Sequence, residues 1–116
     1  MRASTFRTIA LSLPEAEERE TWGEATFRVR DKIFAMMGTD GKRASIKTPK
    51  EEQAALLASD PDAFFYPGYV GVHGWTGVVV RSADAQEIRE LLTDAWRMTA
   101  PKRSVKAFDA LRDGVA

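Results

Sequence analysis

Cysteine is absent from this 116-residue chain, which excludes disulfides, thiolate zinc sites and a cysteine nucleophile. The cytoplasm, where disulfides are rare, is therefore the expected compartment. No stretch approaches the length of about 20 apolar residues that a membrane-spanning helix needs. A secretory signal peptide is not expected either, because Arg2, Arg7 and several hydroxyl side chains interrupt the first apolar stretch.

The chain also lacks net charge, since its 17 basic side chains balance its 17 acidic ones. A strongly basic composition, the usual mark of a nucleic-acid-binding domain, is therefore missing. The charges are nevertheless separated along the sequence. Residues 15–24 hold five acids and one arginine, residues 28–50 hold seven bases and two acids, and residues 97–106 hold four bases and no acid. This separation predicts local surfaces of opposite sign on a neutral protein.

Hydrophobic periodicity predicts the order helix, three strands, helix, two strands, helix. Strands are expected at residues 25–30, 32–38 and 43–47 and within 67–81, and helices at residues 4–13, 49–58, 85–98 and 104–112. Residues 15–21 are expected to form a polar link. The order predicts an α+β fold with an antiparallel sheet of about five strands and helices packed on one face. The length favours one domain, residues 1–116, with residues 101–116 as a short helical or basic tail.

Capping residues and glycines set the expected boundaries of these elements. Thr48, followed by Pro49 and Glu51, predicts a threonine cap with proline at the first helical position. Ser4 and Asp84 are expected to cap the first helix and the long C-terminal helix. In residues 67–81, two β-branched runs flank His73-Gly74, which predicts a hairpin at the apolar centre of the sheet.

Alternation along the strands separates a predicted core from a predicted basic surface. The core is expected to contain Phe27, Val29, Ile33, Ile46, Val78, Val80, Ile88, Leu91 and Leu92. The outward positions are mostly basic: Arg28, Arg30, Arg43, Lys47 and Arg81. Further bases, Lys102, Arg103 and Lys106, follow the long helix. A surface of this kind neutralises phosphates without reading sequence, so these residues are the predicted nucleic-acid site, with weak and largely sequence-independent binding.

The order of several short segments resembles the MmcQ/YjbR family of small bacterial proteins. The segments are residues 22–29 (WGEATFRV), 32–35 (KIFA), 47–49 (KTP), 66–69 (YPGY), 74–78 (GWTGV) and 91–92 (LL). The resemblance spans about residues 6–98. It implies a CyaY-like α+β fold, shared in outline with frataxin, and binding of DNA through a double-wing arrangement.

No residue set in the chain forms a catalytic signature. His73 is the only histidine, and no carboxylate or pocket is predicted beside it, so the protein is expected not to be an enzyme. The acids of residues 15–20 lack the spacing of a metal-binding loop, and neither a metal nor another cofactor is expected. Tyr66, Tyr69 and Trp75 are capable of stacking on bases, but packing in the core or at its rim is the favoured interpretation.

Two classes of function remain open at this point. The first is a non-enzymatic DNA-binding module that uses the basic sheet face. The second is an adaptor in which the same face binds an acidic protein or a small molecule. No membrane partner is expected, and the chain is expected to be a monomer or a weak dimer.

Overall fold

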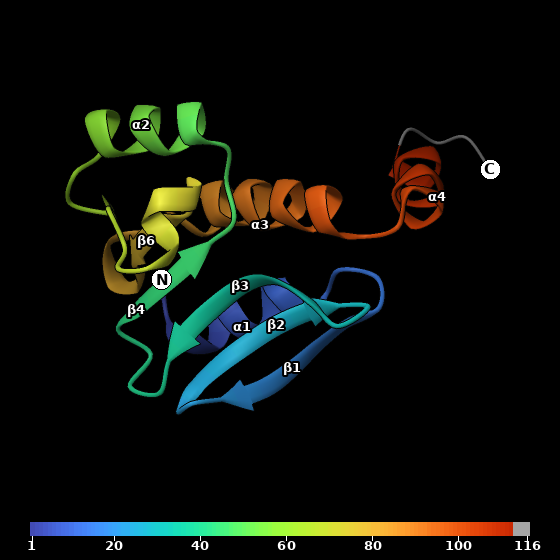
Figure 1. Ribbon diagram of the computed structural model, residues 1–116, viewed down its shortest axis with the longest axis horizontal. Coiled ribbons are helices and arrows are strands. Elements are labelled where there is room, and N and C mark those ends of the chain that lie inside the picture. The colour runs from blue at the N-terminus through green and yellow to red at the C-terminus, as the bar shows by residue number, and fades with distance from the viewer. Residues whose placement is uncertain (113–116) are drawn as a thin grey trace.

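The computed structural model describes residues 1–112, and these residues form one open antiparallel sheet with four α-helices (Figure 1). The strands follow the order β1-β2-β3-β4-β6-β5 across the sheet. Their bounds are β1 Ala16–Thr21, β2 Glu24–Val29, β3 Lys32–Gly38, β4 Arg43–Ile46, β5 Phe64–Phe65 and β6 Thr76–Val79. The predicted α+β class is confirmed, although the sheet has six strands rather than five.

The additional strand is β1, at a position where the sequence predicted a polar link. β1 pairs with β2 along its whole length, from Ala16 opposite Val29 to Thr21 opposite Glu24. A two-residue turn, Trp22–Gly23, joins the two strands, and both residues have the positive φ of a tight hairpin turn. β1 is held by backbone pairing with β2 at the edge of the sheet. Because its side chains do not alternate between apolar and polar, a sequence pattern does not detect the strand.

The β2–β3 hairpin contains an irregularity that changes one predicted core position. The register shifts between Phe27 and Arg28, so that Ala35 lies opposite Phe27 while Ile33 lies opposite Arg28. Phe34 and Ala35 are both buried, whereas Ile33 is partly exposed. The prediction of Ile33 as a core residue is therefore wrong, because the bulge turns it toward the other face. The remaining eight predicted core residues are buried together.

The predicted hairpin in residues 67–81 is also wrong. Its first half is the 3-10 helix η1 (Val70–His73), which ends at Gly74 with φ +99°, and only β6 is a strand. β6 lies between β4 and β5, with Ser45 opposite Gly77. The hydroxyl of Thr48 donates to the Gly74 carbonyl at 2.6 Å and shares a hydrogen bond with Thr76. Thr48 therefore fastens β6 beside β4.

Because Thr48 is engaged with Gly74 and Thr76, it does not cap the helix that follows. Helix α2 (Lys50–Ser59) begins after Pro49, which makes no side-chain cap. Helix α1 (Ala3–Leu11) likewise begins after Arg2, so Ser4 is not a cap. The prediction for helix α3 (Ala85–Thr99) is confirmed, because the Asp84 carboxylate accepts the Glu87 backbone N–H at 3.0 Å.

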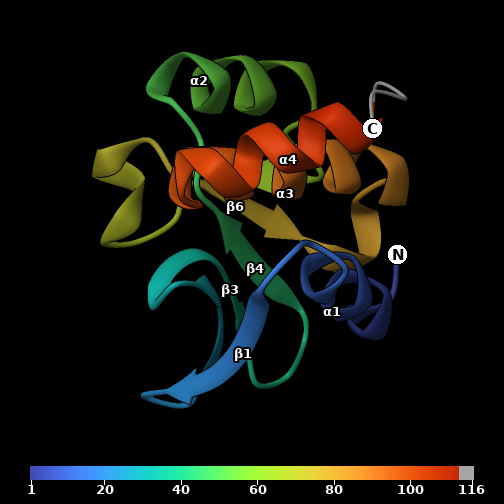
Figure 2. The same ribbon diagram turned by 90° about the vertical axis from the view of Figure 1, so that its right-hand side faces the viewer.

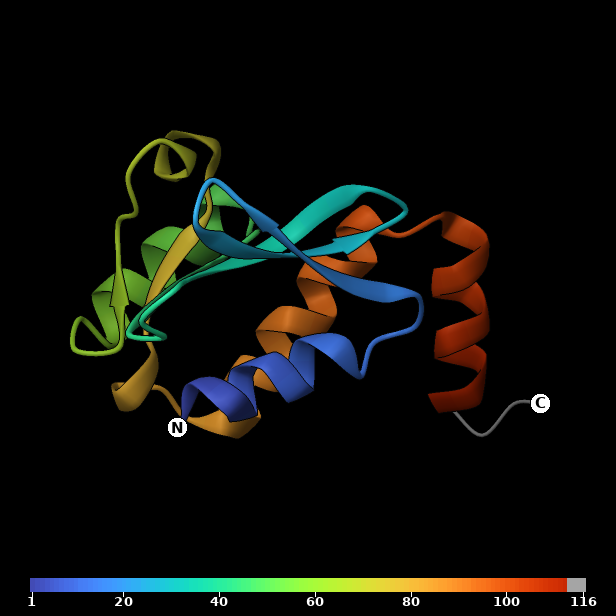
Figure 3. The same ribbon diagram turned by 90° about the horizontal axis from the view of Figure 1, so that it is seen from below.

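Helices α1 and α3 cover one face of the sheet, and the core lies between them and the strands (Figures 1 and 3). Helix α2 packs near the β5–β6 edge. A short 3-10 segment, η2 (Val80–Ser82), leads from β6 toward α3. Within residues 1–112, no helix is both long enough and apolar enough to cross a membrane.

The predicted tail contains helix α4 (Lys102–Arg112), while residues 113–116 lie outside the described part of the chain. α4 buries none of its residues completely. It packs on the core through Val105 and Phe108, and the Phe108 ring centroid lies 5.1 Å from that of Trp96. The Arg97 guanidinium adds an ion pair to Asp109 at 2.6 Å. α4 is therefore an outer layer attached mainly through the last turns of α3.

Candidate nucleic-acid interface

The sheet has an outer face that α1 and α3 do not cover. Both η1 and the β1–β2 turn project on this side (Figures 2 and 3). Of the eight basic residues predicted as a site, Arg28 and Arg43 occupy outward positions on it, because their neighbours along β2 and β4 are buried. Arg28 and Arg43 lie on different strands, separated by β3.

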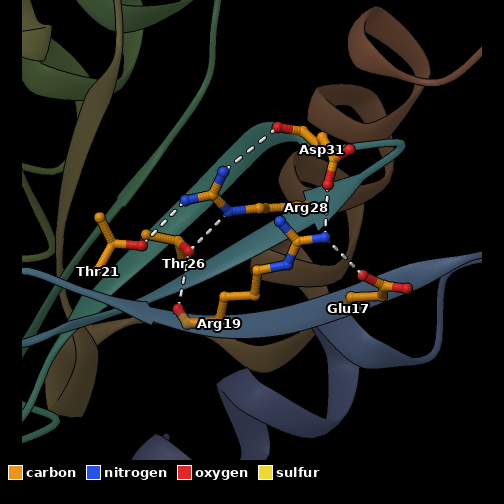
Figure 4. Close-up of polar contacts among 6 residues, drawn as sticks. All are labelled: Glu17, Arg19, Thr21, Thr26, Arg28 and Asp31. Carbon is orange, nitrogen blue, oxygen red and sulfur yellow. Dashed lines mark hydrogen bonds and ion pairs between the residues drawn. The ribbon is translucent and has the colours of Figure 1, made fainter.

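Arg28 is held across the outer face by neutral acceptors. Its guanidinium donates to the hydroxyls of Thr26 and Thr21, both at 3.0 Å, and to the Asp31 carbonyl at 3.4 Å (Figure 4). The neighbouring Arg19 instead forms ion pairs with Glu17 and Asp31. No carboxylate pairs with Arg28 in residues 1–112, so its charge remains on the face, but each of its three guanidinium nitrogens already donates one hydrogen bond within the protein.

Arg30 lies elsewhere, in the β2–β3 turn, where it has positive φ. Its Nε donates to the Glu15 carboxylate at 2.8 Å, and Ser104 of α4 donates to the other oxygen at 2.9 Å. These two hydrogen bonds, with Arg103 close by, hold the pKa of Glu15 below its ordinary value. Arg30 and Arg103 therefore belong to the junction between α4 and the sheet.

An NMR titration should detect this junction. The Glu15 carboxyl is expected to titrate below its ordinary value of 4.5, and Arg30→Gln should raise the midpoint. Because the folded pKa is lowered, the contact stabilises the fold above the ordinary pKa and is lost as pH falls through the folded pKa. Lys32→Gln, a charge loss on the same hairpin away from Glu15, is the control. A Glu15 midpoint that both variants leave unchanged would contradict the contact.

Lys47 lies past the end of β4 and lines a cavity of about 340 Å³ with residues of α3, among them Leu91 and Arg97. It therefore faces the helical layer. Lys102 is exposed at the start of α4, at the opposite end of α3 from Arg81 in η2. The predicted single platform of Arg28, Arg30, Arg43, Lys47 and Arg81 is thus divided among several places, because alternation holds only inside a strand and three of these residues lie in turns or beyond strand ends.

The structure does bring Arg43 and Arg81 together. With Arg2 and Lys42 they line a cavity of about 880 Å³ at the end of the sheet where β4 begins and β6 finishes. We call this cavity, with its four basic residues, the basic cavity. The sequence places Lys42 only within a basic segment and does not indicate a binding role for Arg2, because the place of Arg2 depends on contacts with residues near position 80.

Several contacts hold the walls of the basic cavity. The Met1 amino group donates to the carbonyls of Val80 and Ala83 at 3.1 and 3.0 Å, which places Arg2 beside η2. The Val80 N–H donates to the Lys42 carbonyl at 3.0 Å. Gly41 has φ +71°, and a Cβ there would lie 2.6 Å from the Cβ of Ala3, so the β3–β4 turn packs directly on α1.

The charge of the basic cavity is positive. All four bases are exposed, and none of them forms an ion pair within the described residues. Two acids, Asp40 and Asp62, also line the cavity, which leaves a formal charge of +2 from side chains. Asp40 accepts the Lys42 backbone N–H at 2.9 Å and does not pair with its ammonium group.

Arg43 is the best-positioned of the four bases. Its guanidinium carbon lies 4.9 Å from the centroid of the Phe65 ring. The ring in turn packs on Gly77, where a Cβ would lie 2.5 Å from a ring carbon. Only a glycine at position 77 permits this stacking, so Phe65 and Gly77 together fix Arg43 at the border between the basic cavity and the outer face.

Three aromatic side chains are exposed on the loops around the outer face. Trp22 is 97% exposed, Tyr69 99% and Tyr66 57%. The expectation that these tyrosines pack in the core or at its rim is wrong for Tyr69, which meets solvent, whereas the Tyr66 ring lies against the buried Gly71. Trp75 is partly buried. Trp22 had no distinguishing signal, because it follows a strand that the sequence did not reveal.

The other candidate groups serve local structure. His73 is exposed in η1, and its side chain makes no hydrogen bond or ion pair within residues 1–112. Among the acids of β1 and the segment before it, Glu15, Glu17 and Glu18 pair with arginines. No three His, Asp or Glu residues in the described part of the chain gather in a group that could hold a metal ion.

The described residues form an α+β domain, in which an open antiparallel sheet carries helices on one face and a basic cavity at one end. The chain belongs to the YjbR family, because the sequence model of that family matches residues 11–98. This match confirms the resemblance seen in the sequence. Helix α4 lies beyond the matched residues.

Three mycobacterial proteins, among them Rv2570 of Mycobacterium tuberculosis and Mb2600 of Mycobacterium bovis, are 39% identical to the chain over 56 residues. The match covers 47% of this chain and 42% of each of them, so the chain spans less than half the length of these curated relatives. All are described as uncharacterized proteins. The crystal structure of Deinococcus radiodurans protein DR2400, with a DUF419 domain, matches with a TM-score of 0.75 and 19% identity, over 84% of this chain and 77% of that one. This likeness supports the fold alone.

Proposed function

We propose that the protein is a non-enzymatic module that binds nucleic acid weakly and without sequence preference, with the basic cavity as its main phosphate site. The observation that carries the proposal is the convergence on one cavity of four basic side chains that form no ion pair within residues 1–112: Arg2, Lys42, Arg43 and Arg81. The chain as a whole has no net charge. Arginine forks and a lysine ammonium are suited to phosphate oxygens.

The weakness of binding follows from the charge of the site. Four bases offset by two acids neutralise few phosphates, and each phosphate contact contributes to affinity through release of counterions. A dissociation constant in the range of about 10⁻⁴ to 10⁻⁶ M is therefore expected at physiological salt. Sequence preference is not expected, because the cavity offers charge without an element shaped to enter the major groove.

The proposal takes the cytoplasm as the compartment and a monomer or weak dimer as the active form. It requires no metal or cofactor. The exposed and unassisted position of His73 supports the absence of catalysis, since a general base needs a positioned partner and an enclosed substrate.

Removing charge from the basic cavity should weaken binding in a salt-dependent way. The variant Arg43→Gln/Arg81→Gln is expected to bind labelled DNA less tightly at low salt, because two phosphate contacts are lost. The plot of log binding constant against log salt concentration should become shallower by about 1 for each base removed. Fluorescence anisotropy at several salt concentrations measures both effects.

The matched control is Lys102→Gln/Arg103→Gln, which removes the same charge from α4. This control should leave the affinity and the salt slope nearly unchanged. Equal losses from both double variants would show that total charge, not the basic cavity, determines binding. Absence of wild-type binding at low salt would reject the nucleic-acid proposal and favour an adaptor that recognises an acidic protein.

A further inference from the structure

A groove crosses the outer face next to the basic cavity. It has a volume of about 530 Å³, within the range of about 300 to 1,000 Å³ typical of small-ligand sites. Its floor comes from β3 and β4, including Met36 and Ser45, and its wall from residues 67–70. Glu24 lines its far end, and Arg43 lines both the groove and the basic cavity. The two depressions therefore share one positively charged side chain.

Tyr69 stands at the wall of this groove in a strained conformation. Its backbone has φ +58° and ψ −62°, and the Val70 N–H donates to the Gly68 carbonyl at 2.6 Å. These features define a three-residue γ-turn with positive φ at its centre, a rare and costly conformation for a residue other than glycine. The side chain recovers none of this cost in the free protein, because it is 99% exposed.

We propose that the groove binds an unpaired base of single-stranded DNA, stacked on Tyr69, while Arg43 binds the adjoining phosphate. This inference rests on the proposed function and names its substrate. Arg43 supports binding of a nucleotide phosphate, because it has no carboxylate partner within residues 1–112 and is held in place by Phe65. Glu24 makes the groove lining formally neutral, so the positive charge lies at Arg43 and in the basic cavity beside it. The Phe65 ring itself lies between Gly77 and Arg43, which leaves Tyr69 as the groove's accessible aromatic ring among the described residues.

Selection of single strands follows from the geometry of base stacking. A duplex presents phosphates to the basic cavity, but its bases are stacked on each other and cannot reach Tyr69 without being unpaired. A single strand presents phosphates and free base faces together. The wild-type protein should therefore bind a single strand more tightly than a duplex of equal length at the same salt concentration.

The test uses fluorescence anisotropy with labelled twelve-residue oligo(dT) and a twelve-base-pair duplex at low salt. Tyr69→Ala should weaken single-strand binding by about 5- to 150-fold, the equivalent of one lost stacking contact. Duplex binding should change by less than about twofold, because Tyr69 makes no proposed phosphate contact and the bases of a duplex do not reach it. Tyr69→Phe keeps the ring and should bind as the wild type does. Trp22→Ala, the loss of an exposed aromatic outside the groove lining, is the matched control.

The outcomes separate the two proposals. Equal single-strand binding by Tyr69→Ala and the wild type overturns stacking on Tyr69, and so does an equal loss in Tyr69→Phe. If that result accompanies salt-dependent binding that Arg43→Gln/Arg81→Gln weakens, the proposed nucleic-acid function stands without the base site. Absence of wild-type binding to both DNAs overturns both proposals. Competition by a polyglutamate peptide that displaces the single strand equally from wild type and Tyr69→Ala would assign the face to an acidic protein instead.

Discussion

Replacing Trp96 with alanine should lower the free energy of unfolding by about 3 to 5 kcal/mol, the range found when a large buried aromatic is truncated. Trp96 of α3 is fully buried in the core, and its ring packs on Phe108 of α4. Its Nε1–H donates to the Pro14 carbonyl at 2.9 Å. The substitution therefore opens a cavity, leaves a partly buried carbonyl without its donor, and removes the ring on which Phe108 of α4 packs.

Urea denaturation followed by far-ultraviolet circular dichroism measures this change. The chain provides a matched control in Trp22, which is 97% exposed, so Trp22→Ala should change stability by no more than about 0.5 kcal/mol. The loss expected for Trp96→Ala is a substantial part of the about 5 to 15 kcal/mol that stabilises an ordinary domain. Equal losses from the two tryptophan variants would contradict the burial of Trp96.

Gly74→Ala should be the most damaging of the glycine substitutions near the outer face, with a loss of about 2 to 5 kcal/mol. Its φ of +99° is a conformation that alanine adopts at a cost of about 1 to 2 kcal/mol. The added Cβ would also lie 2.8 Å from the Thr48 carbonyl and 3.0 Å from the Lys50 nitrogen. Both are backbone atoms, so relief of the overlap requires movement of the chain, at about 1 to 3 kcal/mol.

The position of Gly74 explains why the effect should spread. The Gly74 carbonyl accepts the Thr48 hydroxyl that fastens β6 to β4, so displacement of this backbone also loosens the strand pairing. Gly68→Ala is the control, because Gly68 has no positive φ and a Cβ there meets nothing within 4 Å. It should be nearly neutral in the same urea experiment. A Gly74→Ala variant as stable as Gly68→Ala would show that the junction of Thr48 and Gly74 is not closely packed.

Several elements whose signals are local were predicted correctly, although the local signals for the hairpin in residues 67–81 and for the Ser4 cap were misleading. The alternation of β2 and β4 and the apolar spacing and Asp84 cap of α3 depend on residues within a few positions of each other. β1 was missed because the backbone of β2 holds it, not its own side chains. Thr48 was misassigned because its hydroxyl partners lie 26 and 28 residues further along the chain. A partner at that separation overrides a capping motif, and a sequence pattern does not contain it.

The candidate site shows the same division. Alternation placed Arg28 and Arg43 on the correct face, since both lie inside regular strands. It failed for Arg30 and Lys47, which lie just past strand ends where the period of two no longer applies. Arg2 reaches the basic cavity through Met1, whose amino group bonds to carbonyls 79 and 82 residues away. Tyr69 lies at the centre of the γ-turn and is exposed, whereas an aromatic residue beside Pro-Gly is usually packed against the protein. The sequence pattern therefore predicted the wrong environment for it.

The two free edges of the sheet influence how readily the protein aggregates. An exposed edge strand is a template for pairing with a strand of another molecule. β1 forms one edge, and four consecutive exposed charged residues, Glu17 to Glu20, make it a poor template. The other edge, β5, is only two residues long and is followed closely by Pro67. Because the formal net charge is zero, repulsion between whole molecules contributes little, and the protection against edge-to-edge association comes from the chemistry of these two strands.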